Sequence, residues 1–310
     1  MTSSRFEVLS DEQWARIEPL LPSNAGRRGH PFGDDRRVVE GIAYRYRTGV
    51  AWRDVPREHF GPWQTIWKRH RRYAADGTWD RVLAGLLAQA DAAGKIDWTV
   101  SVDATINRAH QHATNTTHPE QDTGATSNHT PAVDGFVHSA LGGAREPAGH
   151  GIGRSRGGLT TKIHAAVDGN GRPLAVVVTG GQRNDGAVLA AVLADIRVPR
   201  AGAGRPRTRP VAVIADRAYS SGVTRRMLAR RGIKAVIPQK RDEIAARKRR
   251  GRLGGRAPHL DAEVYKNRNV VERAFALAKQ WRAIATRYDK LAITYRAAVV
   301  LAACITWSRI

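Results

Sequence analysis

The sequence predicts a mixed α/β protein in which a small helical domain precedes a domain built on a mixed sheet. Through residues 1–94, apolar side chains recur every three or four positions, which is the period of amphipathic helices. From Asp97 onward, segments that alternate as half-buried strands do are interleaved with helical segments. We therefore place the domain boundary after residue 94 and assign residues 95–310 to the second domain.

The first domain is predicted to contain four helices. Ser10 and Gln13 form a capping-box pattern before the first helix, and Gly94 follows the fourth, where glycine commonly ends a helix. The second helix is expected at 35–47. The third follows Pro62, because proline suits the first turn of a helix.

The third helix, PWQTIWKRHRRY, has two unlike faces. An apolar stripe at positions i, i+3, i+4 and i+7 is expected to face the core, and it consists of Trp63, Ile66, Trp67 and His70. We interpret its tryptophans as core residues rather than base-stacking groups. The polar and basic face carries Gln64, Lys68, Arg69, Arg71 and Arg72. Such a face can bind phosphates, and we predict that it contacts a DNA groove as in a helix-turn-helix.

The second domain is predicted to begin with a strand and a hairpin. DWTVSVDATI alternates as a half-buried strand does, and DGNG is a tight-turn signal between two further strands. VAVIAD and IKAVIP are typical of buried strands. The predicted order is strands at 97–106, 159–167 and 173–179, a helix at 185–196, a strand at 211–216, a helix ending at Gly232, a strand at 233–238, a helix at 261–287 and a last helix from about residue 291.

Two segments of the second domain lack a regular pattern. Residues 108–150 are rich in His, Thr and Gly and are expected to form an irregular insertion. Residues 239–260 are strongly basic and rich in glycine, which predicts a mobile loop or an arm that lies on DNA. Neither segment is expected to contribute to the core.

The charge of the chain indicates a polyanionic partner. Its 310 residues include 51 Lys and Arg against 28 Asp and Glu, a formal net charge of +23. We expect nucleic acid as the partner, although an arginine-rich proteome would also give a basic chain. The one cysteine, Cys304, excludes an intramolecular disulfide framework and a cysteine-based zinc cluster.

No export or membrane signal is expected. The opening MTSSRFEVLS has no apolar core, and the apolar stretch 297–307 is too short to span a bilayer. We expect a cytoplasmic protein, or one associated with the bacterial nucleoid.

The run YKNRNVVERAFALAK near the C-terminus is the most informative part of the chain. Tyr265, Arg268, Glu272 and Lys279 fall within an arc of about 60° on a helix. A carboxylate between two cations and a phenol suits a phosphate substrate with a metal ion. The alternative is a solvated face with an Arg268–Glu272 pair worth about 0.3 kcal/mol. The far side of this helix is expected to face the core through Val271, Ala274, Phe275, Leu277 and Ala278.

Two aspartates could complete a metal site with Glu272. Asp103 and Asp216 are placed at the ends of predicted strands, where carboxylates can meet across a sheet. Three converging carboxylates stay ionised only with cations between them, and oxygen ligands favour Mg²⁺ or Mn²⁺ over zinc. Two such ions suit phosphodiester chemistry. Either aspartate alone could instead be a helix or turn cap.

These motifs resemble DDE transposases of bacterial insertion sequences, in the group around insertion sequences four and five. The spacing Tyr, two residues, Arg, three residues, Glu, six residues, Lys matches the signature of their last catalytic helix without a gap. DRAY at 216–219 is similar to their second-aspartate motif, and SVDAT to their first-aspartate strand. LSDEQWARIEPLLP, AWRDVP and RSRGGLTTKIHAAVDGNGRPL also resemble that group, so the likeness covers nearly the whole chain.

The resemblance implies a catalytic domain with a ribonuclease-H-like fold. The order of the predicted strands and helices also resembles that fold. It implies that Asp103, Asp216 and Glu272 bind two Mg²⁺ or Mn²⁺ ions and form the catalytic triad. Metal-activated water would cut the transposon end, and the 3′ hydroxyl would then attack target DNA. Arg268 and Lys279 would hold phosphates, and Tyr265 would pack on the strand. The partners implied are the terminal inverted repeats, target DNA and further copies of the chain.

Other candidate site residues lie outside this signature. Arg154, Arg156 and Lys162 could approach DNA, although the same stretch is compatible with a β-bulge. The histidines at 110, 112 and 118 are expected to be solvated rather than zinc ligands. The segment Gly151–Gly153 lacks the third glycine of a dinucleotide loop and the remainder of a P-loop, so we expect no nucleotide cofactor.

Two other functions compete with transposition. An inactive or domesticated element would bind DNA as a regulator and would be expected to lack a triad carboxylate, yet all three are present. A metal-dependent nuclease of the same fold would cut without joining, and strand-transfer products would separate it from a transposase.

Overall fold

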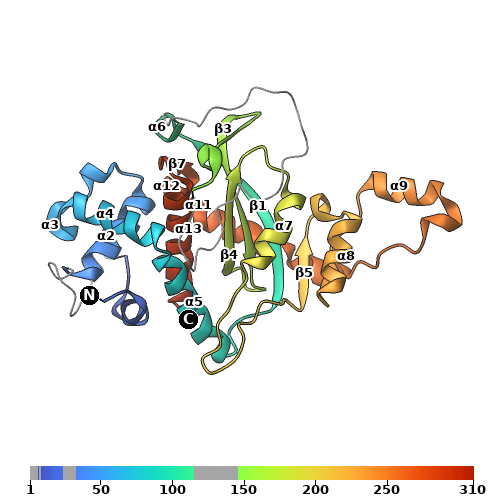
Figure 1. Ribbon diagram of the computed structural model, residues 1–310, viewed down its shortest axis with the longest axis horizontal. Coiled ribbons are helices and arrows are strands. Elements are labelled where there is room, and N and C mark those ends of the chain that lie inside the picture. The colour runs from blue at the N-terminus through green and yellow to red at the C-terminus, as the bar shows by residue number, and fades with distance from the viewer. Residues whose placement is uncertain (1–5, 7, 24–32, 115–145) are drawn as a thin grey trace.

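The computed structural model describes residues 6, 8–23, 33–114 and 146–310, and its centre is a mixed sheet (Figure 1). Five strands lie in the order β4-β3-β1-β5-β6, in which β1 is antiparallel to β3 and parallel to β5. Short strands β2 and β7 pair with β3 and β1. The bounds are β1 Thr99–Ala109, β2 Gly153–Ser155, β3 Gly158–Val167, β4 Pro173–Gly180, β5 Ala212–Ala215, β6 Lys234–Val236 and β7 Thr286–Arg287. This arrangement confirms the predicted mixed sheet.

Helices cover both faces of the sheet and form a separate layer beside it (Figure 1). α7 packs on β3 and β4, and α11 packs on β1 and β3 from the opposite face. The bounds are α1 Asp11–Ile17, α2 Asp35–Thr48, α3 Arg57–Phe60, α4 Trp63–Ala75, α5 Thr78–Ala92, α6 Gln111–Thr114, α7 Asp185–Ala194, α8 Gly222–Arg230, α9 Arg241–Arg249, α10 Ala262–Tyr265, α11 Asn269–Lys279, α12 Arg282–Ala285 and α13 Ala292–Trp307.

Local sequence signals fix several of these helices. The Ser10 hydroxyl accepts from the Gln13 N–H and the Gln13 side chain accepts from the Ser10 N–H, which confirms the capping box. Gly49 ends α2 in the left-handed conformation, at φ 76°. Ser221 caps α8 through the Thr224 N–H. α5 begins with Thr78 itself, and the residue before it is Gly77 in the left-handed conformation.

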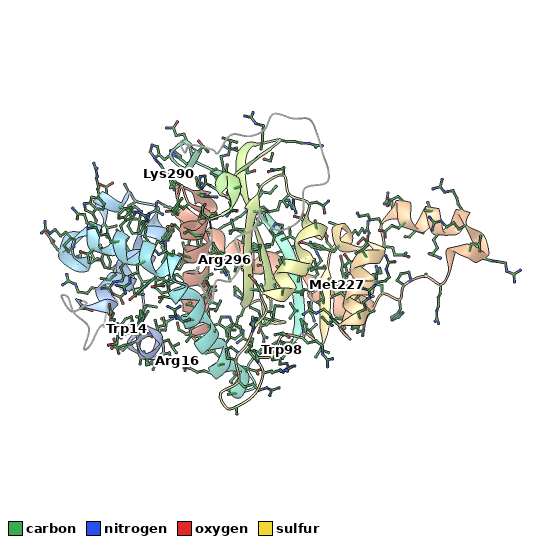
Figure 2. All side chains as sticks on the ribbon, viewed as in Figure 1. Trp14, Arg16, Trp98, Met227, Lys290 and Arg296 are labelled. Carbon is green, nitrogen blue, oxygen red and sulfur yellow. The ribbon has the colours of Figure 1, made fainter. Side chains whose placement is uncertain are left out.

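One hydrophobic core joins the N-terminal helices to the sheet. α13 is almost wholly buried and packs against α4 and α5 on one side and β4 on the other. Buried residues from Leu9 to Trp307 belong to the same cluster. Arg296 of α13, labelled at the centre of Figure 2, forms a buried bidentate ion pair with Asp80 of α5 at 2.8 and 3.0 Å. The boundary predicted after residue 94 is therefore a change from helices to strands. The hydrophobic core is continuous across it.

The basic segment 239–260 forms a helical arm, which corrects the expectation of a loop. α9 extends away from the rest of the molecule, and none of its residues is buried (Figure 1). The helix forms because its charges suit the helix dipole: Asp242 and Glu243 stand in its first turn and three cations in its last. Glu243 also accepts from the Lys240 N–H and from the Ser220 hydroxyl, which fixes the base of the arm.

The predicted helix at 261–287 is shorter than expected. α10, a 3₁₀ turn at Lys266–Arg268 and α11 follow one another, and the helix ends at Lys279. Trp281 then adopts an extended backbone before α12. Leu277 was expected to face the core but is 61% exposed, because α11 meets the sheet through Val270, Val271 and Phe275.

The expected insertion at 108–150 is regular at both ends. Arg108 and Ala109 continue β1, because they pair with β7, and α6 follows. Residues 115–145 of that expectation, with His118, lie outside the described residues. Within the part of the chain that is described, no helix combines the length and apolar character needed to cross a bilayer.

Candidate active site

Asp103 and Asp216 lie side by side on one face of the sheet. Val102 pairs with Ala215 in the parallel β1–β5 ladder, so the residue that follows each points to the same face. Neighbouring strands are about 5 Å apart. Asp216 directly follows β5, as predicted, whereas Asp103 lies in the middle of β1. The strand continues past Asp103 because its later residues pair with β3 as far as Arg108–Thr160.

Asp216 also caps a turn, which is the alternative role that the sequence left open for it. Its Oδ1 accepts from the Ala218 N–H at 2.8 Å and so starts the 3₁₀ turn Arg217–Tyr219. Asp103 Oδ1 accepts from the Ala104 N–H at 2.8 Å. In each carboxylate the described backbone contact uses Oδ1, and Oδ2 of Asp103 accepts from the Arg268 guanidinium.

Arg268 joins Asp103 to Glu272. Its Nη2 donates to Asp103 Oδ2 at 2.7 Å, and its Nη1 donates to Glu272 Oε1 at 2.7 Å. The Arg268–Glu272 pair expected for a helix face is therefore present. The same guanidinium also bonds Asp103 of β1. The side chain of Asp103 is 16% exposed, and that of Glu272 is 56% exposed.

The three carboxylates are not preassembled around an ion. Among the residues that the structure describes, no three His, Cys, Asp or Glu side chains are positioned together as metal ligands. Glu272 reaches Asp103 only through the Arg268 guanidinium. Burial raises the pKa of Asp103, and the charges of Asp216 and Asp185 raise it further, while the Ala104 N–H and Arg268 lower it. The neighbouring carboxylates thus favour a cation beside Asp103.

Asp185 and Tyr219 belong to the same acidic region. Asp185 begins α7 and was expected only as a helix start, yet its charge acts on Asp103 and on Tyr219. Tyr219 is buried, and within the described part of the chain its hydroxyl has no hydrogen-bond partner. Burial and then Asp185, Asp103 and Asp216 raise the pKa of this phenol. The motif DRAY could have indicated that Tyr219 belongs to the site. No motif in the sequence indicated that Asp185 lies near the three carboxylates.

Lys162 is not a surface contact, which corrects the prediction that it binds DNA. It is 8% exposed, and its Nζ donates to Asp185 Oδ1 at 2.9 Å and to the Arg183 carbonyl at 2.7 Å. Its place in β3 points it inward toward α7, so it balances the Asp185 charge. Arg154 and Arg156 are exposed on the tight β2–β3 hairpin, where Ser155 pairs with Gly158.

The other two residues of the helix signature, Tyr265 and Lys279, contact different strands of the sheet. Tyr265 is half-buried and packs against Ile214 and Val236 on the sheet. Lys279 is exposed and donates from Nζ to the Ile106 carbonyl at 3.1 Å, and burial of its amine lowers the pKa of Lys279. Both therefore stand beside the strands that carry Asp103 and Asp216, although a 3₁₀ turn separates the helix of Tyr265 from that of Lys279.

The basic face of α4 is narrower than predicted. Gln64, Lys68, Arg71 and Arg72 are exposed. Arg69 is only 7% exposed, because it pairs with Asp35 of α2 and donates to the Tyr73 hydroxyl at 3.2 Å. It links two helices and is corrected from a DNA contact to a structural residue. Ile66 and His70 are buried as expected, while Trp63 and Trp67 are half-buried.

Comparison with known families matches almost the whole chain. Residues 95–307 match the model described as "Transposase DDE domain", and residues 9–83 match that described as "Putative transposase of IS4/5 family". The first match contains Asp103, Asp216, Glu272 and the rest of the helix signature.

Curated relatives carry similar descriptions. The chain is 40% identical over 108 residues to an uncharacterized 16.2 kDa protein of insertion element IS402 of Burkholderia cepacia, covering 33% of this chain and 74% of that protein. It is 35% identical over 149 residues to the putative transposase of IS402 of the same organism, covering 48% of this chain and 63% of the relative. It is 30% identical to the putative transposase of IS6501 of Brucella ovis, covering 49% of this chain and all of the relative.

A solved structure shows a more distant likeness. The chain is 10% identical to a chain in the crystal structure of the Mos1 strand transfer complex, with a TM-score of 0.24 and coverage of 84% and 80% of the two chains. The assignment rests on the sequence families and on the residues that they contain. The chain belongs to the DDE transposases of bacterial insertion sequences, enzymes that catalyse transposition by cutting and joining DNA.

Proposed function

We propose that Asp103, Asp216 and Glu272 are the catalytic carboxylates and hold two Mg²⁺ or Mn²⁺ ions in this transposase. The observation that carries the proposal is the β1–β5 register, which sets Asp103 and Asp216 on one face, together with the guanidinium that joins Asp103 to Glu272. The three residues lie far apart in the sequence, and the β1–β5 register and the Arg268 guanidinium link them in the fold, which supports a shared role.

The residues present fit divalent ions. The donors are carboxylate oxygens, which Mg²⁺ and Mn²⁺ prefer. The Arg268 guanidinium takes a cation's place between Asp103 and Glu272, and it neutralises the charge that an ion would otherwise balance. When bound, two ions would activate an attacking oxygen and stabilise a leaving oxygen at a phosphodiester. Arg268 would then be released from the carboxylates to pair with a DNA phosphate.

The neighbouring residues are proposed to position DNA. Lys279 and Arg268 lie beside the carboxylates and would hold phosphates near the scissile bond, and Tyr265 would pack against the strand. Further contacts are proposed at exposed residues away from the site, on the β2–β3 hairpin and on α4. They are Arg154, Arg156, Gln64, Lys68, Arg71 and Arg72.

The DNA partners proposed are the terminal inverted repeats and the target. We place recognition of the repeats in residues 1–94, through the basic face of α4 in a helix-turn-helix-like arrangement. We also propose that the chain acts as a homo-oligomer, because synapsis of two transposon ends needs at least two copies. The nucleoid is its proposed place of action.

End cleavage by an Asp216→Asn variant tests the proposal. The substrate is the DNA that borders the reading frame, with its inverted repeats, and Mg²⁺ is supplied. We expect cleavage and strand transfer to be lost while binding to the ends stays nearly unchanged, since the variant removes charge and not shape. Glu263→Gln, an exposed carboxylate on α10, is the matched control and should retain activity. Cleavage by Asp216→Asn with Mg²⁺ would contradict the assignment, and cutting without joining by the native chain would indicate a nuclease.

A further inference from the structure

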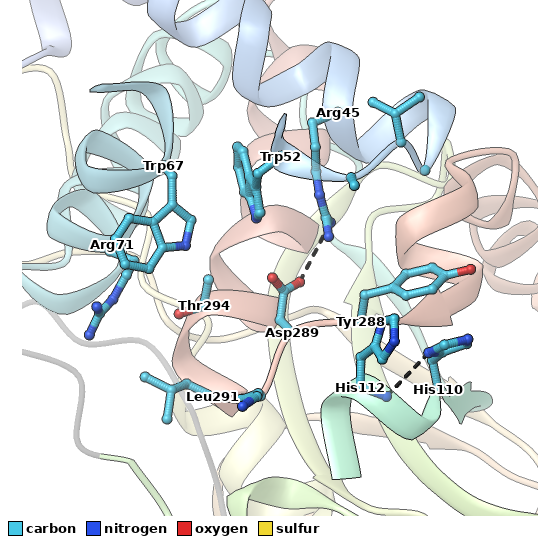
Figure 3. Close-up of a pocket in the computed structure, with 14 residues that line it drawn as sticks. Arg45, Trp52, Trp67, Arg71, His110, His112, Tyr288, Asp289, Leu291 and Thr294 are labelled. Carbon is cyan, nitrogen blue, oxygen red and sulfur yellow. Dashed lines mark hydrogen bonds and ion pairs between the residues drawn. The ribbon is translucent and has the colours of Figure 1, made fainter. Parts of the chain in front are cut away.

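A cavity of about 670 Å³ opens between the N-terminal helices and the end of the sheet, apart from the acidic site. Its walls come from the end of α2 and the segment that follows it, from α4, from the start of α6 and from the turn between β7 and α13 (Figure 3). His110 directly follows β1, so the cavity lies seven residues along the chain from Asp103, about 20 Å along an extended strand.

Aromatic rings stand on two sides of this cavity. Trp52 and Trp67 lie on one side in Figure 3, and Tyr288 lies on the other with His110 and His112. The His110 ring is 4.7 Å from the Tyr288 ring at a tilt of 35°. Trp52, Trp67 and Tyr288 are half-buried, and each has a neighbour: Arg45 lies 4.9 Å from the Trp52 centroid, Arg71 lies beside Trp67 and His110 beside Tyr288. The part of each ring that stays exposed is what a planar ligand would contact. Such rings bind a nucleic-acid base by stacking, whatever its identity.

Arg45 has two buried donors that no described residue uses. It is 4% exposed, and its Nε and Nη1 have no hydrogen-bond partner among the residues that the structure describes. Its Nη1 lies 3.9 Å from Asp289 Oδ2, an ion-pair distance beyond hydrogen-bond length. That carboxylate oxygen already accepts from the Tyr46 hydroxyl at 3.0 Å. A buried donor without an acceptor is costly, so an incoming acceptor would be favoured here.

The charge of the cavity favours an anion. Arg45, Arg71 and Lys290 contribute three positive charges, and Asp289 contributes one negative charge. Arg71 and Lys290 are exposed, so they reach the mouth of the cavity, while Arg45 lies at its base. The guanidinium of Arg71 lies 4.9 Å from the Trp67 ring centroid, which holds cation and ring together. An aromatic base with an attached phosphate matches all these features.

We propose that this cavity binds one nucleoside phosphate unit, with the base against the aromatic rings and the phosphate toward Arg45, Arg71 and Lys290. The unit is either an unpaired nucleotide of a DNA strand or a free nucleotide. The DNA source rests on the proposed function, because only bound DNA would bring a strand to this place. The free nucleotide does not depend on it.

The test uses 2-aminopurine, whose fluorescence is quenched when the base stacks. It is offered to the full chain as the free deoxynucleoside 5′-monophosphate, as the one unpaired nucleotide in a duplex, and in the same duplex fully paired. Trp52→Leu removes a ring, and Arg45→Met removes the buried cation. Arg47→Met is the control for the second change, because Arg47 is exposed on the same helix and does not line the cavity.

We expect the native chain and Arg47→Met to quench the probe, and Trp52→Leu and Arg45→Met to weaken its binding about tenfold or more. Quenching of the unpaired but not the paired duplex identifies a DNA strand as the source, and quenching of the monophosphate identifies a free nucleotide. If Arg45→Met does not fold, Trp52→Leu alone decides. Equal binding by the native chain and Trp52→Leu, or no quenching of any probe, overturns the proposal.

Cleavage of the paired transposon end by the same protein separates the two proposals. Loss of quenching in Trp52→Leu together with no metal-dependent cleavage by the native chain would leave the cavity assigned and the proposed active site wrong. Cleavage by the native chain with unchanged quenching in Trp52→Leu would support the proposed active site and show that the cavity proposal is wrong.

Discussion

Arg268 and Asp103 are 165 residues apart in the chain and are joined by a hydrogen bond of 2.7 Å. The same guanidinium bonds Glu272, so one cation holds two of the three proposed metal ligands. The finding makes Arg268 a competitor of the metal ion as well as a candidate phosphate contact.

Arg268→Met is therefore expected to strengthen metal binding while it weakens cleavage. Without the guanidinium, Asp103 and Glu272 lose their neutralising charge, and Mn²⁺ should bind the DNA-free chain several-fold more tightly. Electron paramagnetic resonance of free Mn²⁺ measures this affinity. Arg273→Met, an exposed arginine on the same helix, is the control. Weaker Mn²⁺ binding by Arg268→Met would show that the guanidinium does not stand in for an ion.

The buried Arg296–Asp80 pair should be costly to break. Arg296→Met leaves the Asp80 carboxylate buried without a partner and should lower the free energy of unfolding by about 3–5 kcal/mol. Urea denaturation measures the change. Because the pair joins α13 to α5 within one core, the chain should unfold in a single transition. A double variant, Arg296→Met with Asp80→Leu, should recover much of the loss, and two separate transitions in the native chain would contradict a shared core.

Stability should fall as the pH drops from 6.5 toward 4. Burial lowers the pKa of His70 and of His164 to about 4, so between these values the unfolded chain binds more protons than the folded chain. Each histidine should cost about 3 kcal/mol over this range. For His70 the nearby Asp289 opposes the shift and Arg45 supports it.

Thermal or urea unfolding across this pH range measures the effect. His164→Gln should flatten the profile, and the exposed His259→Gln should leave it as it is. A native profile without slope between pH 6.5 and 4 would show that these histidines do not stay neutral in the fold.

The α9 arm should contribute to DNA binding and not to folding. Arg247, Lys248 and Arg249 carry three charges in its last turn, and none of the helix is buried. Replacing the three with alanine should reduce the slope of log affinity against log salt by up to about 2.7, at 0.9 per phosphate contact. A gel-shift titration in salt measures the slope. The melting temperature should not change, and an unchanged salt slope would remove the arm from the DNA surface.

Periodicity was enough to predict most elements of the fold. The hairpin of β3 and β4, the buried β5 and the capping box of α1 all follow from signals within a few residues. The position of Asp216 directly after β5 was also predictable, because the apolar run of that strand ends at this residue. The signature from Tyr265 to Lys279 identified the family because its spacing is matched without a gap.

What the sequence did not reveal depends on partners distant in the chain. Arg69 looks like its exposed neighbours until Asp35 of another helix neutralises it. Lys162 looks like a DNA contact until Asp185 is placed beside it. The α9 helix was missed because a basic and glycine-rich segment resembles a loop, although its acidic first turn was a local signal for a helix. Pairing across elements cannot be read from one element's composition.

Metal rescue of a Glu272→Cys variant tests the central claim most directly, because Glu272 is the proposed ligand that is joined to Asp103 through Arg268. A thiolate binds Mn²⁺ better than Mg²⁺, which prefers oxygen. If Glu272 is a metal ligand, the variant should cut transposon ends with Mn²⁺ and be inactive with Mg²⁺. Equal activity of the variant with both ions would contradict the claim that these carboxylates share divalent ions.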